Sequence, residues 1–320
     1  MDYHLYHHDD LDGVTSGAVL FDFFKKRGDE IVSFTPLEYS ASFDDQSKAW
    51  EQFEFKKPSI LVDFRYHPAA DWWIDHHQSA FAKPAWQEEY KNDDQHMWDP
   101  KAPSACGLVV RFLQEVHRME ITDRIHELAR VVDIDDSAGY ATLEDALELD
   151  TPSRQIQLLL GDAELKKDRV QYVALRQFLI KNLITAGMDT IVNMEAYSGR
   201  IAELRTQRLA ADEIVKAQAT VRGNVIIIEK EAAAVQASRW AAYAAHPHIP
   251  YSIQIREKAD DVKISIGSNK WCGTPSQINL GEIAKRYGGG GHFGVGAIFV
   301  KDKKEAQTIV YAILEELNKQ

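Results

Sequence analysis

The sequence predicts an α/β protein of two domains, in which a parallel-sheet domain precedes a smaller α/β domain. The chain has 320 residues, which is more than one hydrophobic core commonly organises. Strand-like and helix-like segments alternate through the first 80 residues, as they do in the βαβ units that build parallel sheets. A second series of short strands and helices begins near residue 221. We therefore expect domains at 1–190 and 221–320, joined by a helical linker at 191–220.

Short apolar segments bounded by polar residues, glycine or proline predict the strands of the first domain. These strands are Tyr3–His7, Glu30–Phe34, Ser59–Asp63 and Trp72–Asp75. Apolar residues recur at spacings of three and four within Gly13–Lys26, which predicts a helix that Gly28 ends. A polar loop is expected at Phe81–Pro103, and Ser104 is the expected N-cap of the helix after it. Further helices are expected at Ile121–Val132 and Asp168–Ala186.

The remaining elements follow the same patterns. Glu203–Ala219 is a polar helical stretch that either connects the domains or lies on the surface as an amphipathic helix. The second domain is expected to contain the strands Asn224–Ile228, Tyr251–Ile255 and Val262–Ile266, and the helices Val235–Ala245, Leu280–Tyr287 and Lys304–Leu317.

Composition and charge narrow the classes of function. The chain has 45% hydrophobic residues and a formal net charge of -12, which argues against sequence-independent binding of long nucleic acid but leaves a short or single-nucleotide substrate open. No signal peptide is recognisable, and apolar runs such as Val225–Ile228 are too short to span a bilayer. We therefore expect a cytoplasmic protein with no membrane association. Cys106 and Cys272 lie far apart, which predicts neither a disulfide framework nor a thiolate metal site.

Acidic and histidine residues gather where three of the predicted strands end. The three clusters are His8-Asp9-Asp10-Leu11-Asp12-Gly13, with the spacing His-x-Asp-x-Asp-Gly, then Asp63, then Asp75-His76-His77. Ligands of open parallel sheets bind at the carboxyl ends of the strands. We therefore expect the three clusters to meet in one crevice.

So many carboxylates in one place would repel one another unless cations neutralised them. One ion would leave several acidic groups unpaired, whereas two ions bridged by a central carboxylate, for which Asp63 is the candidate, would satisfy the set. Carboxylates and imidazoles without a thiolate favour manganese over structural zinc, with magnesium, cobalt or iron as alternatives. The pattern predicts two divalent metal ions and hydrolysis of a phosphoester.

Other interpretations of these residues are weaker. The run from Asp10 to Thr15 resembles the nucleophile loop of haloacid-dehalogenase-type phosphatases. That loop follows an aliphatic strand, whereas histidines and a tyrosine precede it here, and Asp75-His76-His77 would have no role. A calcium loop is excluded because no Glu closes it, and a P-loop because no Gly-Lys-Ser/Thr follows the glycines.

The order of these motifs resembles the DHH phosphoesterase superfamily. Its members include RecJ-like exonucleases, nanoRNases, cyclic-dinucleotide phosphodiesterases, manganese pyrophosphatases and exopolyphosphatase-related proteins. Gln277–Ala297, which reads QINLGEIAKRYGGGGHFGVGA, resembles the glycine-rich motif of the DHH-associated C-terminal domain. The resemblance spans nearly the whole chain and implies a catalytic DHH domain, a substrate-binding C-terminal domain and an active-site cleft between them.

The resemblance also implies roles for individual residues. Its metal ligands would be His8 and Asp10 for one ion, Asp12 and His76 for the other, and Asp63 for both. The family's fourth acidic motif would supply Asp136, with Asp133 as the alternative. Asp63, His76 and His77 would be the catalytic residues, with His77 facing the substrate phosphate. Asp75 would orient a histidine rather than bind a metal.

The glycine run fits a role in binding substrate. Its backbone can approach a ligand closely, so Gly289, Gly290 and Gly291 would present N–H groups to a phosphate or base, with a flexible loop as the alternative. His292 would donate to the same anion, and Ser268 would also contact substrate.

One position departs from the family pattern. Related domains carry Ser-x-Arg-Ser on the strand before the glycine run, whereas this chain has Gly267 at the place of the arginine. A phosphate clamp is therefore missing or is supplied by another residue, such as Lys270 or Arg286.

The expected activity is attack of a metal-bound hydroxide on phosphorus, without a covalent enzyme intermediate. The expected substrates are short phosphodiesters or nucleotides: oligoribonucleotides, as for an exonuclease, dinucleotides and 3'-phosphoadenosine phosphate. Hydrolysis of polyphosphate or pyrophosphate is one alternative. A nucleotide-binding module with weak catalysis is the other, kept open by Gly267. Whether the chain forms a homodimer stays open.

Overall fold

The computed structural model describes residues 1–38, 48–230, 236–257, 261–273 and 276–319. Its contacts divide the chain into two compact units. The first unit consists of Met1–Tyr140 and Leu149–Ala202, and the second of Ala141–Glu148 and Glu203–Gln320. Among the described helices, none combines the length and the apolar character that crossing a membrane requires.

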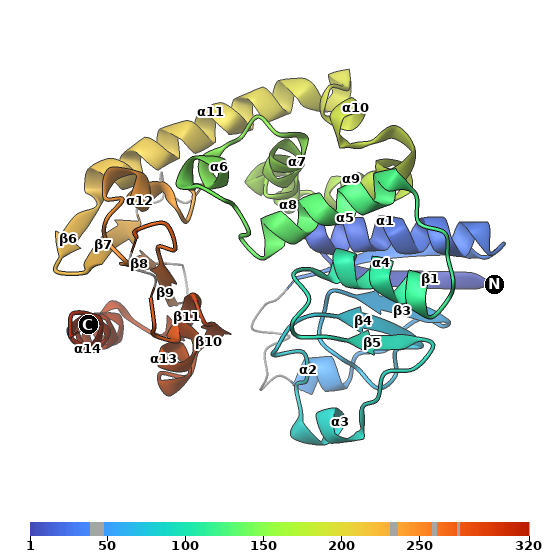
Figure 1. Ribbon diagram of the computed structural model, residues 1–320, viewed down its shortest axis with the longest axis horizontal. Helices are drawn as coiled ribbons and strands as arrows, with labels where there is room; N and C mark the ends of the chain where they lie inside the picture. The colour runs from blue at the N-terminus through green and yellow to red at the C-terminus, as the bar shows by residue number, and fades with distance from the viewer. Residues whose placement is uncertain (39–47, 231–235, 258–260, 274–275, 320) are drawn as a thin grey trace. The chain divides into compact units, whose positions relative to one another are not determined.

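The first unit contains a parallel sheet of five strands in the order β2-β1-β3-β4-β5 (Figure 1). The strands are β1 (Asp2–His8), β2 (Glu30–Leu37), β3 (Ser59–Val62), β4 (Trp72–Asp75) and β5 (His96–Trp98). The predicted parallel sheet is confirmed. The expectation of a loop at Phe81–Pro103 was wrong in part, because this segment contains α3 (Pro84–Glu89) and the edge strand β5. Three residues of β5 are too few to show a strand period in the sequence.

Helices cover the sheet of the first unit on both faces. They are α1 (Leu11–Lys26), α2 (Lys48–Glu51), α3, α4 (Ala105–Glu115), α5 (Asp123–Asp136), α7 (Pro152–Leu160), α8 (Ala163–Lys167), α9 (Arg169–Ala186) and α10 (Met188–Val192). Two neighbouring residues of β4 show the two faces: Trp72 packs against aromatic rings of α1 and α4, whereas Trp73 packs against Tyr66 and Phe81. Helices α1, α4 and α9 therefore form the layer on the Trp72 side (Figure 1).

The second unit contains a mixed sheet of six strands in the order β10-β11-β9-β8-β7-β6, in which only β7 and β8 are parallel. The strands are β6 (Thr220–Arg222), β7 (Val225–Lys230), β8 (Tyr251–Glu257), β9 (Val262–Ser268), β10 (Gly290–His292) and β11 (Val295–Val300). Its helices are α6 (Leu143–Leu147), α12 (Ala241–Ala245), α13 (Leu280–Arg286) and α14 (Lys303–Leu317). The helix α11 (Glu195–Gln218) contains the division between the units.

The expected helix Val235–Ala245 was too long. Residues 231–235 lie outside the described part, and α12 begins only at Ala241. The reason is Ser238, whose backbone N–H donates to the Asp212 carboxylate while its hydroxyl accepts from the N–H of Trp240. These bonds hold residues 236–240 in a turn, where a helix would need the same groups for its own first turn.

Candidate metal centre

The carboxyl ends of three neighbouring parallel strands carry the clustered side chains. His8 ends β1, Asp63 directly follows β3, and Asp75 ends β4, while the sheet order places β1, β3 and β4 side by side. The three sequence clusters therefore meet at one edge of the sheet, as their positions predicted.

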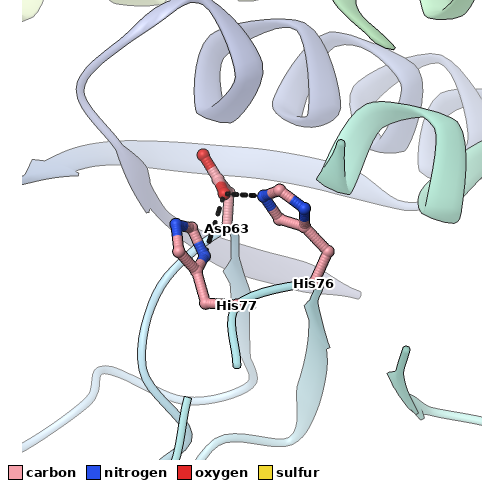
Figure 2. Close-up of side chains that lie close together, drawn as sticks. All are labelled: Asp63, His76 and His77. Carbon is pink, nitrogen blue, oxygen red and sulfur yellow. Dashed lines mark ion pairs between the residues drawn. The ribbon is translucent and has the colours of Figure 1, made fainter. Parts of the chain in front are cut away.

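Asp63 lies at the middle of this group. Its carboxylate is 3.7 Å from His76 Nε2, 3.7 Å from His77 Nδ1 and 3.4 Å from His8 Nδ1 (Figure 2 shows the first two pairs). Asp63 is 1% exposed, yet neither carboxylate oxygen has a hydrogen-bond partner among the described residues. Burying a carboxylate without partners is costly. The site is therefore one that a cation would complete.

Among the described residues, the side chains form three overlapping groups that could each hold a metal ion. The ligand atoms in each group lie within 4.8 Å of one another, and two of the groups are His8 with Asp10 and Asp63, and Asp12 with His76 and Asp136. The third is Asp63 with His76 and His77. Asp63 is shared by two of these groups, and the donor set of carboxylates and imidazoles suits a divalent cation such as manganese or magnesium.

The first acidic motif is held by the start of α1. The Asp10 carboxylate caps this helix by accepting from the N–H of Gly13 at 3.1 Å. A Cβ atom on Gly13 would lie 2.2 Å from the backbone oxygen of His8. Glycine is therefore required here so that β1 can turn directly into α1 and bring His8 next to Asp10, 3.0 Å away.

Asp12 and His76 are each fixed by backbone groups. The two oxygens of Asp12 accept from the N–H groups of Ala105 and Cys106, at 2.7 and 2.8 Å, where α4 begins. His76 Nδ1 lies 3.1 Å from the carbonyl oxygen of Ala102, to which it must donate. The other ring nitrogen of His76, Nε2, faces Asp12 at 3.6 Å and Asp136 at 3.3 Å, where it is placed to act as a metal ligand.

Asp75 holds His77 rather than the ring of His76. Asp75 is fully buried, and one of its oxygens accepts from His77 Nδ1 at 2.8 Å and from the backbone N–H of His76 at 2.9 Å. Burial alone would lower the pKa of His77, but the charge of Asp75 outweighs it and raises that pKa to about 9. His77 is therefore protonated at neutral pH.

The other titratable groups respond to the crowding of negative charge. Burial, followed by the charge of Asp63, raises the pKa of Asp12 well above its usual value and that of Asp136 to about 6. Burial alone would lower the pKa of His8. The nearby Asp10 and Asp63 carboxylates have the larger combined effect, so the pKa of His8 is raised. A divalent cation would offset the charge of Asp63, which is the second cause of the raised pKa of Asp12 and Asp136.

The structure separates the two candidates for the fourth acidic motif. Asp136 is the last residue of α5 and groups with Asp12 and His76. Asp133 instead accepts a hydrogen bond from the Ser104 hydroxyl at 2.6 Å, and its carboxylate fills the space beside Gly107. The geometry therefore favours Asp136 as the ligand and gives Asp133 a role in positioning α4.

Sequence reasoning missed a buried network around Asp9. Arg176 of α9 is fully buried and donates to the backbone oxygen of Asp9 at 2.9 Å, while Tyr172 donates to the Asp9 carboxylate at 2.7 Å. Lys166 is 3.2 Å from the same carboxylate. The available signal was an arginine among the apolar residues Leu175, Leu179 and Leu183 of α9.

The glycine run of the second unit contributes a strand. A Cβ on Gly289 would lie 2.1 Å from the backbone oxygen of Ala297, and one on Gly291 would lie 2.2 Å from that of Val295, whereas nothing lies within 4 Å of one on Gly290. The close pairing of the β10 segment with β11 thus explains why glycine occupies positions 289 and 291. Neither a flexible loop nor a bound ligand is needed to explain these two glycines. The side chain of His292 lies outside the described part. Ser268 donates to the backbone oxygen of Gly294 at 3.1 Å.

Comparison with known proteins identifies the fold. Over 99% of both chains, the structure is similar to the pGpG-specific phosphodiesterase PggH from Vibrio cholerae, with 22% sequence identity and a TM-score of 0.71. The DHH domain of a member of a family of ribosomal proteins is 16% identical, with a TM-score of 0.61, over 99% of this chain and 87% of that one. RecJ from Thermus thermophilus in complex with Mn²⁺ is 15% identical, with a TM-score of 0.57, over 100% of this chain and 52% of that one.

No family model and no curated protein matches the sequence. The structural similarities show that the chain has the fold of DHH-domain proteins, which the order of its sequence motifs predicted.

Proposed function

We propose that this chain is a hydrolase of short phosphodiesters that works with two divalent metal ions, most favourably manganese. The observation that supports this proposal is the buried Asp63 carboxylate, which lies between two groups of metal-ligating side chains and has no hydrogen-bond partner among the described residues. A pair of ions bridged by Asp63 would satisfy both groups at once. RecJ, which has a similar fold, is known in complex with Mn²⁺ and with Mg²⁺, which supports a divalent ion of this kind.

Dinucleotides are the substrate class that we favour. PggH, to which the chain is similar over its whole length, is named a pGpG-specific phosphodiesterase. The net charge of -12 disfavours a long polyanion, whose binding requires many phosphate contacts from Lys and Arg. Both observations support a substrate of one or a few nucleotides.

The residues of the site suit in-line hydrolysis. Bound metal ions would supply an activated water and neutralise charge on the phosphate oxygens. His8, Asp10 and Asp63 would hold one ion, and Asp12, His76, Asp136 and Asp63 the other. His77 uses Nδ1 to bond Asp75, and Nε2 of the protonated ring would donate to a phosphate oxygen.

A substrate panel tests the proposal. The purified protein is incubated with Mn²⁺ and pGpG, pApA, 3'-phosphoadenosine phosphate, a short RNA or polyphosphate, and the products are separated by chromatography. We expect mononucleotides from the dinucleotides, and no turnover when EDTA replaces Mn²⁺.

Three outcomes would contradict the proposal. Full activity after exhaustive dialysis against EDTA would refute metal dependence. Turnover of polyphosphate alone would favour the polyphosphatase alternative. Tight binding of dinucleotides without turnover in saturating Mn²⁺ would favour a nucleotide-binding module.

A further inference from the structure

Another side chain lies beside Gly267, the position at which the family resemblance implies an arginine. The hydroxyl of Tyr243, from α12, donates to the backbone oxygen of Gly267 at 3.0 Å, and it would lie 3.5 Å from a Cβ at this position. Ser252 Oγ would lie 3.3 Å from the same Cβ. A long side chain at position 267 would crowd both hydroxyls, which favours another position for a cation that contacts substrate.

The two cations considered from the sequence have different surroundings. Both Glu316 oxygens lie within 2.8 Å of Arg286, an arrangement that neutralises the guanidinium on the surface of α13 and α14. Lys270 lies on the loop directly after β9, two residues beyond Ser268. Of these two cations, Lys270 is therefore the one that follows directly on the end of β9.

The loop that carries Lys270 is held rigidly by Asn269. The Asn269 side chain is 1% exposed and donates to the backbone oxygens of Pro247 and Ile249, at 2.9 and 3.1 Å. Its carbonyl oxygen accepts from the N–H of Trp271 at 3.1 Å. Lys270 and Trp271 are therefore presented on a preorganised turn, which lowers the entropy lost on binding.

Two indole rings and two cations meet at this turn. The rings of Trp240 and Trp271 lie edge to face, with centroids 5.3 Å apart and an interplanar angle of 81°. The Arg239 guanidinium lies 4.4 Å from the Trp240 ring, and the Lys270 ammonium lies 5.1 Å from the Trp271 ring. Both indoles are half-buried, whereas both cations are exposed. We call these four residues the Trp240–Trp271 platform.

We propose that the Trp240–Trp271 platform is a nucleotide-binding site, in which an indole stacks on a base of the substrate and Lys270 and Arg239 contact its phosphate. Aromatic rings bind any base through its π-face, and neighbouring cations bind the backbone phosphate, which together define a site for a short single-stranded nucleotide. Two exposed cations therefore lie beside two indoles in a chain whose formal net charge is -12. This inference deepens the proposed function and rests on it for the identity of the substrate.

The first test measures binding without catalysis. Equilibrium dialysis of the metal-free full chain with GMP and with guanosine gives dissociation constants that do not depend on turnover. Trp271→Leu should weaken both ligands about tenfold, in line with the free energy of one stacked base. Lys270→Met should weaken GMP by a few-fold and leave guanosine unchanged, because only GMP carries the phosphate.

Matched variants separate stacking from folding. Trp271→Phe keeps an aromatic face and should recover most of the affinity that Trp271→Leu loses. Trp86 and Lys83 form a similar pair in the first unit, 5.3 Å apart, so Trp86→Leu and Lys83→Met should leave the affinity for GMP unchanged. Unchanged affinity in Trp271→Leu, or no recovery in Trp271→Phe, would overturn the inference.

The second test asks whether the contribution depends on the base. The ratio of kcat/KM on a dinucleotide to that on its abasic analogue should fall about tenfold in Trp271→Leu and stay constant in Trp86→Leu. An unchanged ratio in Trp271→Leu would overturn the inference. If the wild-type chain hydrolyses no phosphodiester but loses GMP affinity in Trp271→Leu, then the proposed catalysis fails while the binding site stands.

Discussion

Arg176 is fully buried and donates to the backbone oxygen of Asp9, which stands between the candidate ligands His8 and Asp10. The guanidinium also bonds the backbone oxygen of Leu160 at 3.0 Å. It therefore ties the loop between β1 and α1 to helices from later in the chain. Removing one member of a buried charged network costs about 3–5 kcal/mol, and here it also takes the guanidinium donor away from the backbone oxygens of Asp9 and Leu160.

We predict that Arg176→Met lowers the free energy of unfolding by about this amount and weakens Mn²⁺ binding, because the loop loses its fixed position. Urea denaturation and calorimetric titration measure the two effects. The control is Arg200→Met, which removes an arginine that bonds Asp162 in the same unit and is 31% exposed. Equal losses in both variants would show that Arg176 has no specific effect on the metal centre.

Asp63 offers a direct test of the bridging role. Its backbone has a φ of 56°, a region that Asn adopts more readily than Ala, so Asp63→Asn removes the charge with less backbone strain than Asp63→Ala. Loss of a residue that supports a metal ligand can lower activity by roughly 100-fold. We expect Asp63→Asn to lower turnover by more than this, because Asp63 would itself be a ligand. The unfolding temperature without metal should not fall, because the variant relieves repulsion among the carboxylates.

The matched control is Asp93→Asn, which removes a surface carboxylate that pairs with His96 at 2.9 Å. It should leave turnover unchanged. Wild-type turnover in Asp63→Asn would show that this carboxylate does not bridge metal ions.

Asp133 and Asp136 should behave differently when each is changed to Asn. Asp136→Asn removes a member of the Asp12 and His76 group, so we expect the number of bound Mn²⁺ ions to fall from two to one, as measured by titration under electron paramagnetic resonance. Asp133→Asn weakens the bond to Ser104, so we expect lower stability with the metal stoichiometry retained. The opposite pattern would make Asp133 the ligand.

The pH dependence of the metal-free protein should be unusual. Carboxyl groups whose pKa is raised in the folded state, such as Asp136 to about 6, favour folding while protonated, and this contribution is lost as pH rises from about 4 through 6. The pKa of His77, raised to about 9, changes the stability in the same direction. Its stabilising contribution is fully present below about pH 6.5 and is lost as pH rises through 9. Asp10 has a lowered pKa and opposes this trend at acidic pH.

We therefore expect the unfolding temperature without metal to fall as pH rises from 5 to 8, whereas the shift caused by Mn²⁺ increases because the ligands are deprotonated. Differential scanning calorimetry with EDTA and with Mn²⁺ measures both. An Mn²⁺ shift that is independent of pH would contradict the assigned carboxylate ligands.

Substitutions in the glycine run distinguish glycines that are needed for the fold from a glycine that contacts a ligand. Gly289→Ala places a Cβ 2.1 Å from a backbone oxygen of β11, so we expect it to destabilise the protein by about 1–3 kcal/mol. Gly290→Ala meets no atom within 4 Å and should change stability by less than about 0.5 kcal/mol. If Gly290→Ala raises the KM for a dinucleotide at unchanged stability, then the backbone at Gly290 approaches the substrate. An unchanged KM would remove Gly290 from the substrate site.

The parallel sheet and the meeting of the three clusters could be predicted from the sequence. Apolar segments that alternate with helical patterns determine βαβ topology locally, and that topology places the ends of its strands at one edge. His8, Asp63 and His76 could therefore be grouped before any contact was known. The short strands β5 and β10 could not be predicted, because three residues are too few to show a period.

The sequence by itself determined which kinds of side chain gather at the carboxyl ends of the strands, because strand order and chain direction follow from local patterns. Only the tertiary structure separated the surroundings of Asp133 and Asp136, which lie three residues apart on α5: Asp133 bonds Ser104, whereas Asp136 lies near Asp12 and His76. It also decided that Arg176 supports Asp9 from 167 positions away, and that Tyr243 lies beside Gly267. These relationships depend on how whole helices pack and on the direction of each side chain, and neither is encoded in the spacing of residues along the chain.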